Sequence, residues 1–242
     1  QAGARVAILA RRIEPATAVA AAIETGGGTA LALSADVRER AQVERACATI
    51  VERWGRVDIL INAAGGNMPG ATLAPETSPI DLDPEAFRAV VDLNLIGVLL
   101  PSLVFGAAMI AASGQGTIIN ISSMAAQRPL TRIAGYSAAK AAVENLTRWM
   151  AIELTRRHGP GLRVNAIAPG FFIGEQNRAL LLNPDGSLTA RGANILAHTP
   201  AGRFGVPEDI IATLLWLCSP GAAFVNGAVI PVDGGFSAFS GV

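Results

Sequence analysis

One stretch decides the predicted fold, and it reads Thr117-Ile-Ile-Asn-Ile-Ser-Ser-Met-Ala-Ala-Gln-Arg-Pro-Leu-Thr-Arg-Ile-Ala-Gly-Tyr-Ser-Ala-Ala-Lys140. Its β-branched start, residues 117–121, has the composition of a strand and ends in two serines. A polar loop with one proline follows, and the alanine-rich segment after it predicts a helix. Tyr136 and Lys140 are four positions apart, so this helix would place them on one face.

The pair has a specific chemical use. Tyr136 is the only tyrosine of the chain and Lys140 is the only lysine. A phenol titrates near pH 10, and a neighbouring ammonium lowers that pKa by favouring the phenolate. Tyr136 could then exchange a proton with a carbonyl or alcohol oxygen that Ser123 also hydrogen-bonds. The alternative is a surface tyrosine and a solvated lysine, but the serine-ended strand upstream favours the catalytic interpretation.

Ser123 lies thirteen residues before the tyrosine of Y-x-x-x-K, and this spacing resembles the signature of the short-chain dehydrogenase/reductase family. The resemblance extends over residues 1–242 and implies one Rossmann-like domain that moves a hydride between NAD(P)H and a CH-OH group. Tyr136 would protonate the alkoxide, and Lys140 would lower the pKa of Tyr136 and bind the nicotinamide ribose. Ser123 would orient the carbonyl oxygen. Asn94 would be the fourth catalytic residue, holding a water behind Lys140; its structural alternative is a buried amide that bends its helix.

Apolar runs predict the order of elements. Strands are expected at 5–10, 29–34, 57–61, 117–121, 162–167 and 228–232, with helices at 15–25, 38–54, from 84, at 136–157 and at 207–219. This alternation predicts a doubly wound parallel sheet flanked by helices. The first strand and the T-G-x-x-x-G-x-G turn of the family are absent from the sequence. We therefore expect an N-terminally truncated domain whose sheet lacks its central strand.

Arginines follow the first predicted strand. Ala10 stands where an NAD-selective site usually has an acidic residue for the ribose 2′-hydroxyl. Arg11 and Arg12 could bind a 2′-phosphate instead, so NADP(H) is favoured over NAD(H). The alternative is two exposed arginines with no ligand.

Further cofactor residues are implied by the resemblance at the ends of later strands. Asp36 is expected beside the adenine, with a helix N-cap for residues 38–54 as the alternative or additional role. Gly174 stands where the family often has a threonine that contacts the cofactor. The full implied set is Arg11, Arg12, Asp36, Val37, Asn62, Ala63, Ala64, Gly65, Tyr136, Lys140, Pro169, Gly170 and Phe172.

Several strings, among them N-A-A-G-G-N-M-P-G-A-T and A-P-G-F-F-I-G-E-Q-N-R, resemble the D-mannonate oxidoreductase (fructuronate reductase) branch of the family. The implied reaction is reduction of the D-fructuronate ketone to D-mannonate, and its reverse. The polar segment 175–206 is expected to form a substrate loop. Expected substrate residues are Asn67, Ser123, Tyr136, Asn177 and Arg178, and Arg128, Arg132 and Gln176 are further candidates. Alternatives are another sugar-acid or 3-oxoacyl reductase, or a non-catalytic scaffold if the glycine-rich turn is truly missing.

The composition limits the kinds of partner that we expect the chain to bind. The formal net charge is zero and no basic run occurs, which argues against nucleic acid. Cys47 and Cys218 have no metal-site spacing, and a cytoplasmic setting is expected. Residues 93–127 carry no charge, and residues 95–112 are long enough to span a membrane. Asn94 and Pro101 argue against a span, so we expect a helix packed against the core and a second subunit in a homo-oligomer, either a dimer or a tetramer.

Overall fold

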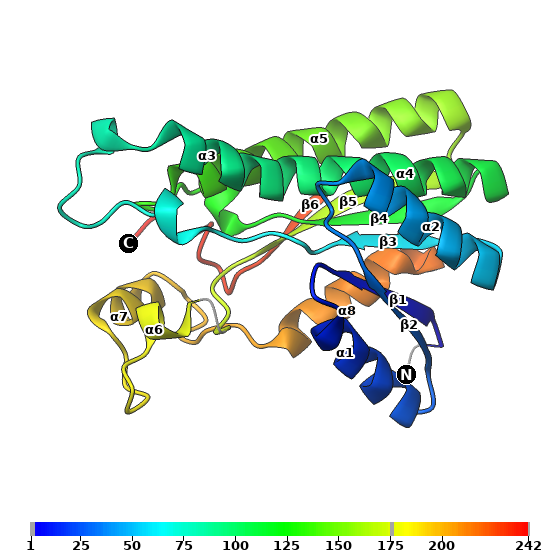
Figure 1. The fold of residues 1–242 in the computed structure, drawn as a ribbon. Helices are drawn as coiled ribbons and strands as arrows, with labels where there is room; N and C mark the ends of the chain where they lie inside the picture. The colour runs from blue at the N-terminus through cyan, green and yellow to red at the C-terminus, as the bar shows by residue number, and fades with distance from the viewer. Residues whose placement is uncertain (1–2, 175–176, 242) are drawn as a thin grey trace.

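A computed structural model describes residues 3–174 and 177–241 (Figure 1). The strands are β1 (Arg5–Ala10), β2 (Thr29–Ser34), β3 (Ile59–Asn62), β4 (Gly116–Ile121), β5 (Leu162–Pro169) and β6 (Val229–Val232). The α-helices are α1 (Ile13–Thr25), α2 (Arg40–Trp54), α3 (Pro84–Val91), α4 (Gly97–Ala112), α5 (Ala134–His158), α6 (Arg178–Leu181), α7 (Ala190–Ala197) and α8 (Pro207–Cys218). A π-helical turn, Asp92–Ile96, joins α3 to α4.

All strand pairs in the described residues are parallel. β1 pairs with β2, and a separate sheet has the order β3-β4-β5-β6. The predicted parallel α/β architecture is therefore confirmed. Among the described residues β1 and β3 do not pair, in line with the interrupted sheet expected from the sequence.

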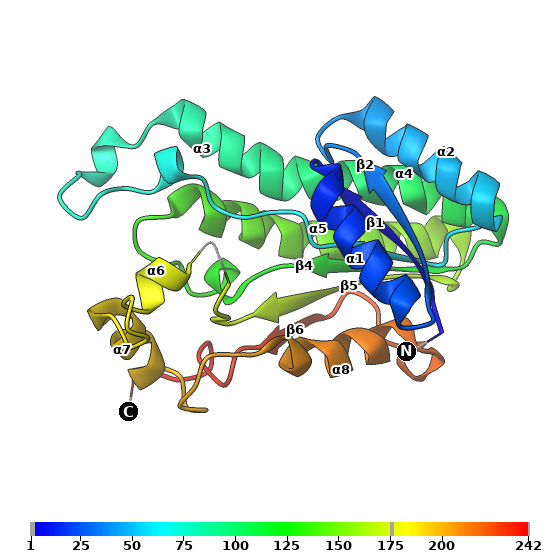
Figure 2. The same ribbon diagram turned by 60° about the horizontal axis from the view of Figure 1, so that its bottom comes forward.

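Helices cover the two faces of the sheet unequally. In Figures 1 and 2, α2, α4 and α5 lie on one face, while α1 and α8 lie on the other. Apolar side chains of α2 and α4 form a single cluster with β1, β2 and β3. A second cluster joins α4 and α5 to β4 and β5, and a third joins α8 to β4, β5 and β6. The carboxyl ends of the strands are left as the edge on which a site can form.

Some predicted bounds differ from the structure. α1 begins at Ile13, so Pro15 is its third residue rather than its first. Segment 175–206, predicted as a loop, contains α6 and α7, which form a lobe beside the carboxyl ends of the strands (Figure 1). The N-cap of α2 is Glu39, so the expected helix-capping role of Asp36 is wrong.

The continuous helical stretch Pro84–Ala112 is long and apolar enough to cross a membrane, with a hydropathy of 2.3. Buried core helices pass the same test of length and composition. In this structure, Phe105 and Met109 of α4 lie in the apolar clusters between the sheet and the helices α2, α4 and α5. A helix that covers the sheet therefore accounts for the apolar stretch.

Candidate active site

Ser123 lies just beyond the buried strand β4, where the chain turns sharply. Its hydroxyl accepts a hydrogen bond of 3.1 Å from the N–H of Ala125, which caps the short helical turn Met124–Ala126. The side chain is held by this cap at the carboxyl edge of the sheet. The predicted strand ending in a serine is therefore placed as the sequence suggested.

α5 brings the tyrosine and lysine to the same place. Lys140 is only 4% exposed, and its Nζ donates a 2.7 Å hydrogen bond to the C=O of Ile121. The same Nζ lies 5.7 Å from the centroid of the Tyr136 ring. The Tyr136 phenol interacts with the Ser123 hydroxyl. The three residues of the signature thus meet at the end of β4.

The pKa values differ from the sequence expectation. Burial raises the pKa of Tyr136, and the hydrogen-bonding interaction with Ser123 opposes this only in part. Burial also lowers the pKa of Lys140 to about 8. The expectation that Lys140 lowers the tyrosine pKa is not met here, because the ammonium donates to the Ile121 carbonyl and both charged forms lose hydration.

Asn94 sits in the π-helical turn and binds the loop after β3. Its Oδ1 accepts from the N–H of Gly66 at 3.0 Å, and its Nδ2 donates to the C=O groups of Gly66 and Val90. A Cβ on Gly65 would lie 2.7 Å from Asn94 Oδ1 and 3.3 Å from Lys140 Nζ. Both interpretations of Asn94 agree with this geometry: the amide is buried within an altered helix, and it lies beside Lys140.

The Asn62 side chain points into the core. Its Nδ2 donates to Ser102 Oγ and to Asn120 Oδ1, both at 2.9 Å, and Asn120 in turn donates to Thr147 Oγ1. All four side chains are buried. The side-chain amide is thus engaged in the core, and the cofactor contact expected of Asn62 stays a prediction for its backbone. Sequence reasoning also missed the network, although Asn120 inside the apolar run 117–121 was a signal for it.

Asp36 is bound mainly by its own neighbour. Arg38 donates to both carboxylate oxygens, at 3.0 and 2.7 Å, and the Arg38 side chain holds the pKa of Asp36 down at about 2. The charge of Arg11 acts in the same direction. Val37 packs on the start of α4, since a Cβ on Gly97 would lie 2.9 Å from its Cγ2.

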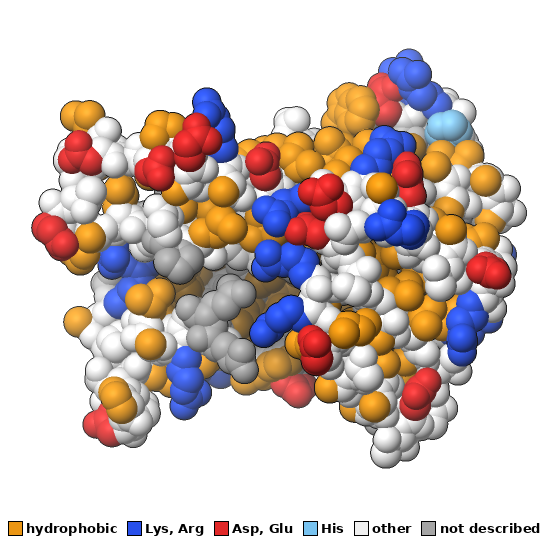
Figure 3. All heavy atoms as spheres, viewed as in Figure 1, with side chains coloured by type: hydrophobic (Ala, Val, Ile, Leu, Met, Phe, Trp, Pro, Cys, Tyr) orange, Lys and Arg blue, Asp and Glu red, His pale blue; other side chains and the backbone are white. Residues whose placement is uncertain are grey.

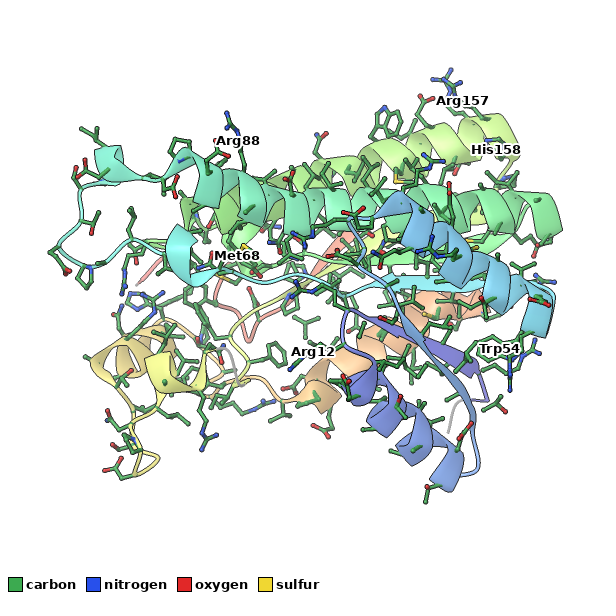
Figure 4. All side chains as sticks on the ribbon, viewed as in Figure 1. Arg12, Trp54, Met68, Arg88, Arg157 and His158 are labelled. Carbon is green, nitrogen blue, oxygen red and sulfur yellow. The ribbon has the colours of Figure 1, made fainter. Side chains whose placement is uncertain are left out.

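Basic side chains gather near the middle of the face shown in Figure 3. Figure 4 shows Arg12 just after β1, at the carboxyl end of the strand. Arg11 and Arg12 are both exposed. A phosphate near this end of the sheet would find these guanidinium groups in reach. The residues present thus fit the ribose-phosphate part of a dinucleotide.

The loop after β5 is shaped by close backbone contacts. A Cβ on Gly170 would lie 2.6 Å from the Cα of Asp233, so only glycine fits there without movement. Phe172 forms a bridge with Gly205 and lines a cavity of about 40 Å³. Pro169 ends β5. Of the remaining cofactor candidates, Ala63 and Ala64 are exposed in the loop that follows β3.

The substrate candidates fall into different groups. Asn67 donates to Thr72 Oγ1, and its buried Oδ1 has no hydrogen-bond partner among the described residues. The Asn177 side chain accepts from the N–H of Gly174 and donates to the C=O of Phe172, so it stabilises the loop in which it lies. Arg178 is the exposed first residue of α6. Gln176 lies outside the described residues.

The two other candidate arginines bind backbone carbonyls. Arg132 donates to the C=O of Leu73 and has a positive φ of 75°. Arg128 donates to the C=O of Ser237 at 3.1 Å. These bonds join the loop between β4 and α5 to two other segments of the chain.

The sequence is similar to known oxidoreductases over almost its full length. Residues 1–237 match a family model described as Enoyl-(Acyl carrier protein) reductase. An oxidoreductase of Bacillus subtilis named UxuB is 48% identical, over 99% of this chain and 88% of the relative.

Two solved structures share the fold at substantial identity. A Haemophilus influenza structure with bound NAD, provisionally assigned as a D-mannonate oxidoreductase, has a TM-score of 0.90 and 44% identity over 99% of this chain and 88% of its own. A gluconate 5-dehydrogenase of Burkholderia cenocepacia, in complex with NADP and tartrate, has a TM-score of 0.82 and 34% identity over 96% and 85%.

Proposed function

This chain belongs to the short-chain dehydrogenase/reductase family, and from that membership we propose that it interconverts the ketone and secondary alcohol of a sugar acid. The favoured pair is D-fructuronate and D-mannonate. The carrying observation is the meeting of Ser123, Tyr136 and Lys140 at the end of β4. When bound, the nicotinamide cofactor supplies or accepts the hydride.

Each residue has one task in this proposal. Ser123 holds the substrate oxygen, and Tyr136 gives or takes the proton at that oxygen. Lys140 is proposed to bind the nicotinamide ribose, and to favour the phenolate once its ammonium leaves the Ile121 carbonyl. Asn94 keeps the loop at Gly65 and Gly66 beside Lys140.

A hydroxylated substrate is supported by Asn67. Its Oδ1 is a buried acceptor without a partner among the described residues, and an unfilled acceptor of this kind costs about 1–3 kcal/mol. A substrate hydroxyl would satisfy it. Arg178, exposed at the start of the α6 lobe, is the candidate for the carboxylate. Asn177 is proposed to shape this loop.

The direct test compares the unchanged enzyme with Tyr136→Phe. We expect NAD(P)H-dependent reduction of D-fructuronate by the enzyme, and a loss of nearly all turnover in the variant with cofactor affinity retained. Gln115→Ala, which removes an exposed amide at the amino end of β4 and away from the site, is the matched control. A Tyr136→Phe rate near that of the control would exclude the assignment.

A substrate panel separates the alternatives. D-Fructuronate, 5-keto-D-gluconate and an acetoacetyl thioester represent the favoured substrate, another sugar acid and a 3-oxoacyl substrate. Preference for the thioester would replace the sugar-acid proposal with a 3-oxoacyl reductase. Absence of NADPH fluorescence enhancement on titration, with folded protein, would favour a scaffold without cofactor.

We also propose that NADP(H) is preferred, because Arg11 and Arg12 follow β1 and Ala10 offers no carboxylate to a 2′-hydroxyl. Replacing both arginines by alanine should raise KM for NADPH by about tenfold or more, through loss of charge-assisted bonds, and leave KM for NADH within about twofold. Steady-state kinetics with both cofactors measures the ratio. An equal change in both constants would contradict the preference.

The expected partner is a second copy of the chain. α4 carries no charged residue, yet Leu103 on it is exposed, as are Trp149 and Ile152 on α5. We propose that these surfaces pack together in a homo-oligomer, in line with the sequence expectation. The free thiols Cys47 and Cys218 support a reducing, cytoplasmic setting.

A further inference from the structure

α5 binds the carboxyl end of β4 through three side chains on one of its faces. Lys140, Glu144 and Thr147 follow one another at spacings of four and three, so they share one side of the helix. Lys140 Nζ donates to the C=O of Ile121, and Thr147 Oγ1 accepts from Asn120 Nδ2. Glu144, which lies between them, has no task in the proton transfer described for this site.

Glu144 accepts a hydrogen bond from the residue that precedes the catalytic serine. Ser122 Oγ lies 3.2 Å from Glu144 Oε1 and 3.4 Å from the C=O of Lys140. The hydroxyl has a single proton, and the carboxylate is the nearer acceptor as well as the charged one. The N–H of Ser122 donates to the C=O of Ile167 in β5 at 2.7 Å. Ser122 is therefore held by the sheet on one side and by Glu144 on the other.

The carboxylate of Glu144 is buried with little compensation. Ser122 is 2% exposed and Glu144 is 5% exposed. The second carboxylate oxygen lies 3.4 Å from a nitrogen of Arg148, whose own side chain is half exposed. A well-packed apolar side chain often stabilises a fold as well as a buried ion pair does. The presence of a carboxylate here therefore points to a role in the geometry of the site.

The bond fixes a strand and a helix that both carry site residues. Ser123 follows Ser122 directly, so the place of its hydroxyl depends on where Ser122 is held. That hydroxyl accepts from the N–H of Ala125 and interacts with the phenol of Tyr136. Tyr136 and Glu144 lie on the same helix. The bond from Ser122 to Glu144 thus sets the distance between the end of β4 and α5.

Binding of a cofactor would make this bond more important. Lys140 is proposed to leave the Ile121 carbonyl for the nicotinamide ribose, and this removes one bond between α5 and the end of β4. Among the described residues, the bond from Ser122 to Glu144 is then the side-chain link between strand and helix that lies nearest to Ser123.

We propose that Glu144 is a positioning residue of the active site, which acts through its hydrogen bond to Ser122 and sets where the Ser123 hydroxyl lies. Glu144 acts on the distance between that hydroxyl and the Tyr136 phenol. The role rests on the proposed function, in which these two groups meet the substrate oxygen.

Three variants separate the bond from the volume of the side chain. Glu144→Met keeps an unbranched chain and removes the acceptor, whereas Glu144→Gln keeps an oxygen acceptor. Ser122→Ala removes the donor. Glu153→Met is the matched control, because Glu153 also lies on α5 and pairs with an arginine four residues on, Arg157, without a hydrogen bond to the sheet among the described residues.

Steady-state reduction of D-fructuronate gives the first measurement. We expect Glu144→Met and Ser122→Ala each to lower kcat by about tenfold or more and to change KM for NADPH by less than about twofold, because displacement of a reacting group slows the chemical step. Glu144→Gln should keep kcat within about threefold of the unchanged enzyme, as Glu153→Met should, because each leaves the Ser122 hydroxyl an acceptor.

The double variant Ser122→Ala/Glu144→Met should lose no more than the worse single variant, because both substitutions remove the same bond, whereas independent losses multiply. Multiplied losses would overturn the inference. An unchanged kcat in folded Glu144→Met, or a loss in Glu144→Gln equal to that in Glu144→Met, would also overturn it.

The second measurement needs neither substrate nor cofactor. Tyr136 is the only tyrosine, so protein with isotope-labelled tyrosine gives a single carbon resonance from the phenol in an NMR spectrum. We expect this resonance to move in Glu144→Met and Ser122→Ala, and to stay in place in Glu153→Met. An unmoved resonance in the first two variants would overturn the inference.

The two measurements also distinguish a wrong substrate from a wrong role for Glu144. If the unchanged protein does not reduce D-fructuronate but the Tyr136 resonance moves in the variants, the proposed function fails and the positioning by Glu144 stands. Should Glu144→Met unfold the chain, Ser122→Ala, which removes only one hydroxyl, gives both measurements.

Discussion

Burial changes the acid–base behaviour of Lys140 relative to a lysine in water. The ammonium is buried, donates to the Ile121 carbonyl, and has its pKa lowered to about 8. Tyr136, beside it, has its pKa raised. Both shifts disfavour charge, so the site as it stands is prepared for proton transfer only when a bound ligand adds hydrogen bonds to the charged forms.

This shift predicts a pH dependence of stability. Because the pKa of Lys140 is lower folded than unfolded, the unfolded chain binds more protons between pH 8 and 10.5, and stability rises with pH in that window. Lys140→Met removes this contribution. We expect the variant's advantage in unfolding free energy at pH 7, about 3 kcal/mol, to vanish by pH 10.5.

Urea unfolding of both proteins across this pH range measures the difference. The comparison cancels the thiols of Cys47 and Cys218, whose pKa values are raised by burial and which act in the opposite direction. A difference that is constant with pH would contradict the lowered pKa of Lys140.

Gly65 predicts a second effect at a single residue. A methyl group there meets Asn94 Oδ1 at 2.7 Å and Lys140 Nζ at 3.3 Å, so Gly65→Ala must displace one of them. We expect a loss of about 1–3 kcal/mol of stability and a larger loss of turnover. Gly106→Ala in α4, where the nearest atom would lie 3.9 Å away, is the matched control and should stay near the unchanged enzyme.

Some of the candidate site residues could be predicted from the sequence and others could not. Ser123, Tyr136 and Lys140 could be found because a strand and one helical turn fix their spacing in the sequence. The direction of the Asn62 side chain could not be predicted, because a polar residue at a strand end looks the same in the sequence whether it faces a ligand or the core. Only the partners Ser102 and Asn120, distant in sequence, decide between the two.

Among the elements, the Asn62 network joins β3, β4, α4 and α5 through side chains alone. Asn62→Ala leaves Asn120 and Ser102 short of a donor in the core, so we expect a loss of about 2 kcal/mol in unfolding free energy. Cofactor affinity of the folded protein should be unchanged. Denaturant unfolding and NADPH titration measure the two, with the exposed Gln115→Ala as control. A selective loss of NADPH affinity would instead show that the Asn62 side chain acts in the cofactor site.

Elements were predictable where apolar runs were continuous. β1 and β2 have the predicted bounds, since their edges coincide with changes to charged or glycine residues. α6 and α7 were missed, because their short turns depend on contacts within the lobe, such as the cap of Thr189 on Gly192, more than on periodicity. The lack of pairing between β1 and β3 in the described residues agrees with the interrupted sheet expected from the sequence.

At the scale of the whole molecule, the exposed apolar side chains of α4 and α5 form a candidate contact between copies of the chain. They lie in one layer (Figure 1), and Trp149 and Ile152 on α5 are each 56% exposed. Apolar surface of this kind on a folded chain usually marks an interface. An isologous contact would bury the same residues on both copies, so one substitution would act twice.

Trp149→Glu combined with Leu103→Glu should therefore divide the proposed homo-oligomer into smaller species, because each copy would contribute two carboxylates and the interface would bury four. Light scattering coupled to size exclusion gives the mass of each form. Ile80→Glu, at a residue that is 92% exposed outside α4 and α5, is the control and should leave the mass unchanged. An unchanged mass in the double variant, or an equal change in the control, would place the contact between copies elsewhere, and α8 with its exposed Trp216 would be the next surface to test.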